Sequence, residues 1–301
     1  MGCIFSIWEG FCMIIAYGKV FREIREEKGI SVRETAKGIV SNSFLSKYEL
    51  GKSNISFENL FLLLDRINCT ITEFIYRANG YKLNSFGELV GSCRKAYEFR
   101  DYDELWNLIK KQKKLYESTK NSTYKVRELM IKAALQNLEK YNMSSEEKKY
   151  LFEYLFNVET WGYFELSIFG NSISIFNDDQ LVQLSKECLN NTPLMRIEMG
   201  IRKEIYSVIL NVILQLICRE KLLEASTLMQ KLEIHDCISM NEKATIRFFE
   251  GIIKIMRGEN SGIEECTFFL KMLKFVGNGV QFKEYKKFFN AICDEYMTHI
   301  E

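Results

Sequence analysis

Apolar positions recur along most of the chain at the spacing of an α-helix. They fall three or four residues apart, which places them on one face of a helix with 3.6 residues per turn. The 301 residues contain a single proline, and proline is excluded from helix interiors but common in the turns of sheet proteins. The pattern therefore predicts an all-α protein, and the length is sufficient for two domains.

Residues 31–51 predict two short helices with a tight connection between them. Ser31 is a typical N-cap for the first helix, and Ser41 or Ser43 caps the second. Gly51 follows the second helix, as a residue that accepts positive φ.

The second of these helices has two different faces. Leu45 and Tyr48 lie three residues apart and are expected to point into a core. The other face carries small, polar or basic side chains and no carboxylate: Asn42, Ser43, Ser46 and Lys47. Such a face suits the major groove of DNA, because it exchanges hydrogen bonds with base edges without repelling phosphates. On this segment alone, an ordinary helical hairpin with a solvated polar face is the alternative.

Three further helices complete a predicted five-helix domain over residues 18–80. The helix over residues 18–28 carries an apolar stripe, and two helices that begin after Ser56 and Thr70 close the domain. Residues 81–86 are predicted to be a linker, short enough to couple the domains mechanically.

Residues 87–301 are a series of apolar helices separated by short interruptions. The segments over 161–170 and 178–189 are predicted to pair as a hairpin. In the clearest repeat, a helix with Gly251 is followed by a turn at Gly258 and a second helix over 263–273. A glycine at a close helix contact is typical of helical hairpin repeats, so we predict a tetratricopeptide-like repeat domain. A plain helical bundle is the alternative. The last helix, over 281–296, is expected to cap the repeats or to supply a dimer surface.

The composition argues against most enzyme classes. The chain has no phosphate-binding glycine loop, no G-x-S-x-G motif and no H-E-x-x-H motif. Its two histidines lie far apart, and its nine cysteines include no Cys-x-x-Cys pair. We therefore expect no catalytic site, no metal and no cofactor, and we expect a cytoplasmic protein with reduced cysteines.

Charge and the N-terminal sequence add two constraints. Residues 18–80 carry ten basic and eight acidic side chains, so DNA binding must depend on local placement rather than on bulk charge.

Residues 1–17 are apolar but interrupted by Glu9, and too short for a membrane span, which needs about 20 residues. We expect a leader without function, or a natural translation start at Met13.

Three stretches carry a family resemblance: YGKVFREIREEKGIS, VSNSFLSKYELGKSNISF and DRINCTITEF. The helix order resembles the repressor type of helix-turn-helix domain. The amino-acid sequences of the three stretches resemble those of the Rgg/GadR/MutR regulators. In the repressor type, an arginine of the first helix pairs with the glutamate before the glycine, which here implies Arg25 and Glu49. Some Rgg-type regulators form an intersubunit disulfide near the position where this chain has Phe57, so that feature is not expected here.

The resemblance implies DNA binding by the second helix of the pair. We expect Asn42, Ser43, Ser46 and Phe44 to meet base edges or a thymine methyl group. Phosphate contacts are expected from Lys47 and Lys52, with Ser31 and Arg33 as helpers. One such domain binds weakly, so a homodimer on two half-sites of promoter DNA is expected.

The resemblance also implies a short hydrophobic signalling peptide, bound by the repeats in quorum sensing. Amides can hold a peptide backbone, and arginine can hold a carboxylate. The candidate residues are Asn171, Arg202, Tyr206, Asn211 and Arg247. The alternatives are a repressor without a peptide ligand and an interaction scaffold that does not bind DNA.

Overall fold

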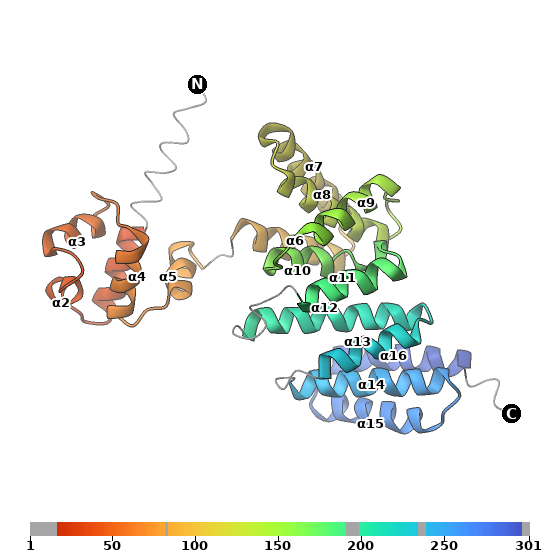
Figure 1. Cartoon of the computed structure of the whole chain (residues 1–301). Coiled ribbons are helices and arrows are strands. Elements are labelled where there is room, and N and C mark those ends of the chain that lie inside the picture. Colours follow the sequence, from red (N-terminus) through yellow and green to blue (C-terminus); the bar gives the residue numbers. More distant parts are fainter. Residues whose placement is uncertain (1–16, 82–83, 191–198, 234–238, 297–301) are drawn as a thin grey trace. The chain divides into compact units, whose positions relative to one another are not determined.

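The computed structural model describes residues 17–81, 84–190, 199–233 and 239–296. Within these ranges the regular structure is helical and contains no strand, as the pattern predicts. No helix among them combines the length and the apolar character that a membrane crossing requires. The chain divides into two compact units, with the boundary after Gly91 (Figure 1).

The N-terminal unit begins with a helix described over residues 17–27. It continues with α2 (Val32–Ala36), α3 (Asn42–Glu49), α4 (Phe57–Arg66) and α5 (Ile71–Ala78). Buried apolar residues from all five helices and from the turn after α4 form one core: Phe21, Ile24, Ala36, Leu45, Tyr48, Leu63, Leu64, Ile67, Cys69 and Phe74. The five predicted helices are therefore present and share one hydrophobic centre.

Local signals explain where these helices begin. The side chains of Ser31, Ser41, Ser56 and Thr70 each accept a hydrogen bond from a backbone N–H in the first turn of the helix that follows. Each bond satisfies a donor that the helix itself leaves without a partner. Ser41, rather than Ser43, is thus the N-cap of α3.

Helix α6 (Ser85–Glu98) begins inside the segment predicted to be a linker. The reason is local, because the Asn84 side chain accepts a hydrogen bond from the backbone N–H of Gly87 at 2.8 Å and so caps the helix. The prediction of a linker over 81–86 is therefore wrong for Ser85 and Phe86, and Phe86 is buried. The boundary between the two units falls within α6.

The C-terminal unit consists of antiparallel helices packed on their neighbours (Figure 1). Its helices after α6 are α7 (Tyr102–Thr119), α8 (Ser122–Asn137), α9 (Ser145–Asn157), α10 (Tyr163–Gly170), the 3-10 turn η1 (Ile173–Ile175), α11 (Asp178–Asn190), α12 (Met199–Cys218), α13 (Leu222–Glu233), α14 (Met240–Met256), α15 (Ser261–Phe275) and α16 (Gly279–Tyr296). The closest pairs are α7 with α8, α12 with α13 and α14 with α15.

One predicted pairing is wrong. The sequence suggests that the segments now seen as α10 and α11 form a hairpin, but α10 packs mainly on α12, and α11 packs on α12 and α9. The cause is η1, whose Ile173 and Ile175 are buried together with Phe176. This apolar turn is anchored in the core, and it separates the two helices.

The predicted close contact at Gly251 is present. Gly251 of α14 faces Gly262 of α15, and a Cβ on Gly262 would lie 2.3 Å from the Gly251 carbonyl oxygen. A Cβ on Gly251 would lie 2.8 Å from the sulfur of Cys266. The two backbones therefore approach as closely as they do only because neither position carries a side chain.

We expect Gly262→Ala to destabilise the C-terminal unit by about 2 kcal/mol, because α14 and α15 must separate to admit the methyl group. Urea denaturation followed by circular dichroism measures the change. Gly91→Ala is the matched control, since a Cβ at Gly91 of α6 meets nothing within 4 Å. Alanine there is expected to be neutral or to stabilise α6 by up to about 1 kcal/mol. Equal midpoints for the two variants would contradict the close-contact argument.

Candidate DNA-binding surface and ligand pocket

Helix α3 presents its polar face to solvent. Leu45 and Tyr48 are buried in the core, which turns the opposite side of the helix outward. The predicted base-contacting and phosphate-contacting residues divide by exposure. Asn42, Ser43 and Lys47 are exposed, and Phe44 and Ser46 are half-buried.

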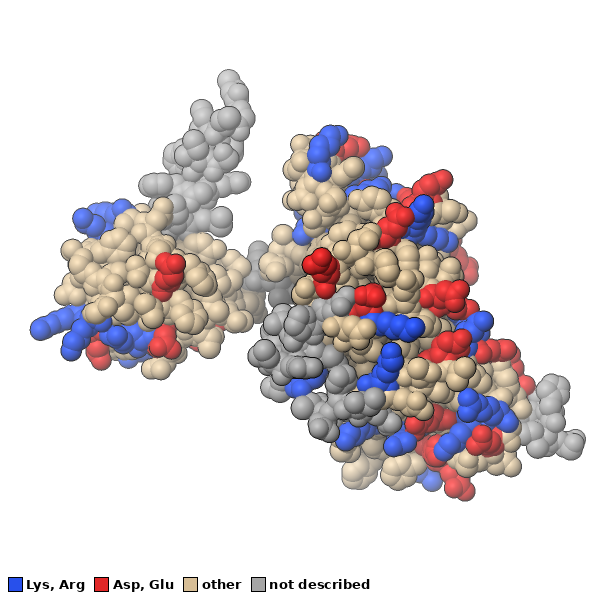
Figure 2. Space-filling view, in the orientation of Figure 1, with Lys and Arg blue, Asp and Glu red and all other residues tan. Residues whose placement is uncertain are grey.

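The surroundings of α3 supply further polar and basic groups. Lys52 and Arg33 are exposed, whereas the Ser31 hydroxyl is engaged in capping α2. Arg66 of α4, which sequence reasoning missed, donates to the backbone carbonyls of Glu34 and Lys37, each at 3.1 Å, and so satisfies the end of α2. Figure 2 shows Lys and Arg side chains along the edge of this unit where Figure 1 draws α2 and α3.

A buried ion pair fixes α3 to the first helix. Arg25 donates from Nε to Glu49 Oε1 at 2.6 Å and from a terminal nitrogen to Oε2 at 2.9 Å. Its other terminal nitrogen donates to the carbonyl of Ile30 at 2.8 Å. Both residues are only 6% exposed, and the hydrogen bond to Glu49 is the largest cause that raises the pKa of Arg25. This bidentate geometry determines the orientation of α3 as well as its position.

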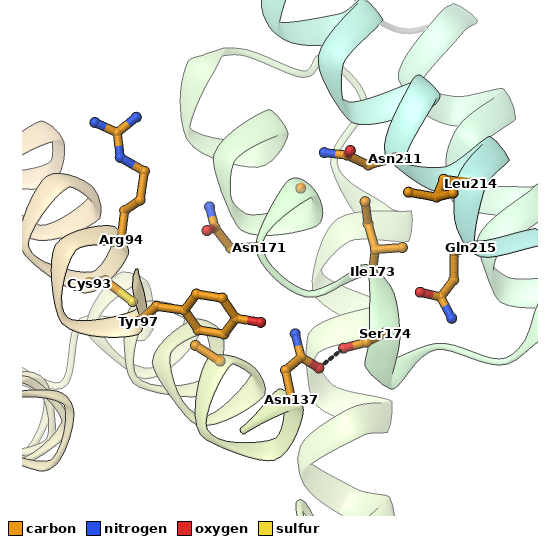
Figure 3. Close-up of a pocket in the computed structure, with 12 residues that line it drawn as sticks. Cys93, Arg94, Tyr97, Asn137, Asn171, Ile173, Ser174, Asn211, Leu214 and Gln215 are labelled. Carbon is orange, nitrogen blue, oxygen red and sulfur yellow. Dashed lines mark hydrogen bonds between the residues drawn. The ribbon is translucent and has the colours of Figure 1, made fainter. Parts of the chain in front are cut away.

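A pocket of about 460 Å³ lies in the C-terminal unit. Five elements line it: Cys93, Arg94 and Tyr97 of α6; Ala134 and Asn137 of α8; Gly170, Asn171, Ile173 and Ser174 at the end of α10 and in η1; and Asn211, Leu214 and Gln215 of α12. Figure 3 shows amide groups from three of these elements around the same opening. None of these described lining residues carries a carboxylate.

Hydrogen bonds hold the wall of the pocket in place. The Ser174 hydroxyl donates to the Asn137 side chain, which joins η1 to α8. Arg219, at the end of α12, donates to the Phe176 carbonyl at 2.8 Å and to Asp178 at 3.0 Å. The η1 turn is therefore clamped from both sides, and its side chains meet the pocket in a fixed arrangement.

Two of the five predicted peptide-binding residues meet in this pocket. Asn171 and Asn211 come from different helices and line the same opening. Asn171 donates one amide hydrogen to the carbonyl of Ser167 at 2.7 Å, which fixes the direction of its side chain. Asn211 is exposed.

The other three predicted residues lie elsewhere. Tyr206 is 1% exposed, and its hydroxyl donates to the Leu232 carbonyl at 3.4 Å, so the ring belongs to the core and offers no wall to a ligand. Arg247 is exposed on α14, where it pairs with Glu250 at 2.6 Å. Arg202 is half-buried on α12 and does not line the pocket.

Sequence reasoning missed Tyr97, Asn137 and Gln215, although a signal for the first two was present. Tyr97, Asn137, Asn171 and Asn211 follow one another at intervals of about 34 to 40 residues, the period of helical hairpin repeats. Equivalent positions of successive repeats lie side by side, so such a series predicts a shared surface.

The cysteines offer no second kind of site in the described part of the chain. Cys69, Cys93, Cys188, Cys218, Cys266 and Cys293 lie there, and burial is the largest cause that raises the pKa of each thiol. Among the same residues, no three acidic, His or Cys side chains gather in a way that would hold a metal ion.

A helix-turn-helix unit joined to stacked helical hairpins defines a transcriptional regulator of the helix-turn-helix type. Residues 21–74 match the helix-turn-helix family. Residues 107–287, more than half of the chain, match the C-terminal domain of the HTH-type transcriptional regulator Rgg. The chain belongs to the Rgg family, which confirms the resemblance seen in the sequence.

Solved structures with the same fold cover almost the whole chain. The SHP pheromone receptor Rgg2 of Streptococcus dysgalactiae is 27% identical, with a TM-score of 0.79, and the match covers 91% of this chain and 99% of that one. A Listeria monocytogenes EGD-e protein is 23% identical, with a TM-score of 0.82 and coverage of 94% and 98%. The PrgX/cCF10 complex is 16% identical, with a TM-score of 0.73 and coverage of 93% for both chains.

We expect Glu49→Gln to lower the free energy of unfolding of the N-terminal unit by about 3 kcal/mol, because it leaves a buried guanidinium without its counter-charge. Hydrogen exchange read by mass spectrometry on the full chain reports this unit separately. Glu26→Gln is the control, since Glu26 also accepts from Arg25 but its side chain is 49% exposed. Little change is expected there. Equal protection of residues 17–78 in both variants would contradict the role of the buried pair.

Proposed function

We propose that the chain is a homodimeric, sequence-specific regulator of promoter DNA that is controlled by a short hydrophobic peptide. In this proposal residues 18–80 bind DNA, and residues 87–301 sense the peptide and dimerise. The observation that carries it is the pairing of an outward-facing, carboxylate-free helix face with an amide-lined pocket in the other unit.

The DNA-binding role rests on the geometry of α3. Asn42 and Ser43 lie in its first turn and are exposed, and the N-terminal residues of a recognition helix are those that reach base edges. Lys47 and Lys52 are exposed further along, where lysine can neutralise phosphates. Arg25 and Glu49 hold the helix in a fixed orientation, which sequence reading requires.

Besides the dimerisation proposed for residues 87–301, the N-terminal unit offers a second candidate surface for a dimer contact. Leu50, Phe57, Phe61 and Leu62 are 49–67% exposed, and the rings of Phe57 and Phe61 lie 6.4 Å apart. The neighbouring exposed rings of Phe57 and Phe61 are the part of this set that favours an interaction surface. We assign this surface to a second copy of the chain, because a protein that binds two DNA half-sites must place two such units on one duplex.

The peptide-binding role rests on the lining of the pocket. Asparagine and glutamine side chains each offer donors and an acceptor, so they can pair with the backbone of an extended peptide whatever its side chains are. Tyr97, Ile173 and Leu214 add apolar surface for hydrophobic residues. The similar structures include one described as an SHP pheromone receptor, which supports a pheromone-type ligand here.

Helix α6 offers a route from the peptide to the DNA-binding domain. Cys93, Arg94 and Tyr97 line the pocket, and the same helix begins at Ser85, beside the DNA-binding domain in sequence. A peptide that prefers one position of α6 would shift the population of dimer arrangements by its difference in affinity.

The DNA-binding role predicts different outcomes for two variants. Lys47→Gln is expected to weaken binding to all sequences and to lower the salt slope by about 1, because one phosphate contact is lost. Asn42→Ala is expected to relax the preference at one base position, at a cost of about 1–3 kcal/mol for the preferred base.

Fluorescence anisotropy with the chain's own promoter and with randomised DNA measures both effects. Lys283→Gln, at an exposed lysine of α16, is the control for charge alone. Unchanged binding by both α3 variants would exclude α3 as the reading helix and favour a scaffold that does not bind DNA.

The pocket predicts that Asn211→Ala weakens peptide binding about five-fold to thirty-fold, because hydrogen bonds to a buried peptide backbone are lost. The probe is a pooled synthetic library of hydrophobic octapeptides, with bound members identified by mass spectrometry. Asn107→Ala, at an exposed position of α7, is the matched control. If the unmodified protein retains no peptide, the chain is a regulator without a peptide ligand.

A further inference from the structure

We propose that a cluster of exposed lysines on α7 binds the phosphate backbone of the same DNA that the N-terminal unit reads. This lysine cluster consists of four side chains: Lys110, Lys111, Lys113 and Lys114. The inference rests on the proposed DNA-binding function and adds a second DNA contact, from the C-terminal unit. Such a contact would raise the affinity for every DNA sequence and would select none, because phosphates carry no sequence information.

Positive charge is concentrated around the lysine cluster. Residues 110–125 contain six lysines and one carboxylate, Glu117, which gives a net charge of +5. The whole chain carries only +1, and residues 18–80 carry ten basic and eight acidic side chains. This part of the α7–α8 hairpin is therefore more positive than the predicted DNA-binding domain. Figure 2 shows Lys and Arg side chains at the end of the C-terminal unit where Figure 1 draws α7.

Helix geometry places the lysine cluster on the outer side of α7. The buried residues of this helix are Leu105, Leu108, Ile109 and Gln112. A helix turns by about 100° per residue, so Lys110 and Lys114 lie almost opposite the buried face. Lys111 and Lys113 lie on either side of them. All four side chains are exposed, so the cluster forms one continuous basic surface.

The fold itself does not account for the lysine cluster. In the described part of the chain, no ion pair within 4.0 Å joins any of the four side chains to a carboxylate. Lysines three or four residues apart on a helix repel one another, as Lys110 repels Lys113 and Lys114. The last turn of α7 contains no basic residue, so attraction to the helix C-terminus is not the reason either. The cluster thus costs stability, and an external anion would offset that cost.

The chemistry of this surface favours nucleic acid over a protein partner. Protein interfaces are centred on aromatic and aliphatic anchors that become buried in the complex. Among the large apolar side chains that are exposed in the described structure, none lies on α7 or α8. Lysine ammonium groups are compact point charges, which suit phosphates and require no apolar contact. DNA is also the polyanion that the other unit of this regulator is proposed to bind.

The short connection between the two units makes such a contact effective. Helix α5 ends at Ala78 and α6 begins at Ser85, so the chain between them spans at most about 25 Å. Once α3 occupies its site, the C-terminal unit is held near the same duplex. A weak contact then becomes an intramolecular step and adds to the affinity. The lysine cluster would supply this contact by releasing counterions from the duplex.

The test measures DNA binding of the full-length protein by fluorescence anisotropy over a series of salt concentrations. The duplexes are the chain's own promoter, extended several helical turns beyond the site, and randomised DNA of the same length. The cluster variant carries four substitutions: Lys110→Gln, Lys111→Gln, Lys113→Gln and Lys114→Gln. We expect it to bind both duplexes about ten-fold or more weakly and to lower the salt slope by about 3 to 4, because four phosphate contacts are lost. The preference for promoter over randomised DNA should not change.

Two further variants control for net charge and for fold. The scattered variant neutralises four exposed lysines on four other helices: Lys186→Gln, Lys203→Gln, Lys243→Gln and Lys271→Gln. It changes the net charge as much as the cluster variant does, and it should bind DNA as the unmodified protein does. Replacement of the four cluster lysines with arginine keeps their charge and should preserve both the affinity and the salt slope.

Equal affinity and equal salt slope of the cluster variant and the unmodified protein would overturn the proposal. An equal loss in the scattered variant would overturn it as well, because net charge alone would then be responsible. Unchanged DNA binding together with a loss of binding to phosphatidylserine vesicles would assign the cluster to a membrane surface instead. If the unmodified protein binds neither duplex, or binds both equally, the proposed sequence-specific function itself is overturned.

Discussion

The orientation of α3 depends on the ion pair between Arg25 and Glu49. This helix has eight residues, and a helix of that length is not stable alone, so contacts with the rest of the unit must hold it. Leu45 and Tyr48 supply burial, which fixes which side faces the core but permits sliding and rocking. The bidentate pair adds direction, because two parallel hydrogen bonds between planar groups tolerate little rotation. A burial contact and a directional contact together hold this short helix in one orientation, as the proposed reading of bases requires.

In the C-terminal unit, burial of apolar surface brings residues from distant parts of the sequence together. Each helical hairpin exposes an apolar face that it cannot bury alone, so successive hairpins stack and bring equivalent positions side by side. Asn137, Asn171 and Asn211 meet at one pocket for this reason, although they are far apart in sequence. The close contact of Gly251 with Gly262 shows how tightly such stacking can bring backbones together.

Much of the fold follows from local signals in the sequence. The serine caps, the apolar pair on α3 and the glycine contact at Gly251 each depend on a few neighbouring residues, and the structure contains them all. Non-local packing was harder to predict. The sequence predicts Tyr206 as part of a peptide site, but α12 is buried on several sides, and its neighbours Ile205, Val208 and Ile209 are buried as well. The α10–α11 hairpin failed because a three-residue turn, η1, is too short to show any periodicity.

The difference between local signals and non-local packing also explains which residues of the candidate pocket the sequence predicts. Residue type alone favoured asparagine and arginine on helices, and this criterion selected Asn171 and Asn211 but also Arg247, whose partner Glu250 lies one turn away. Residues of different helices that meet at one pocket are a property of the packed structure. Repeat spacing is the one sequence signal that carries information about this packing, since it states which distant residues occupy equivalent positions.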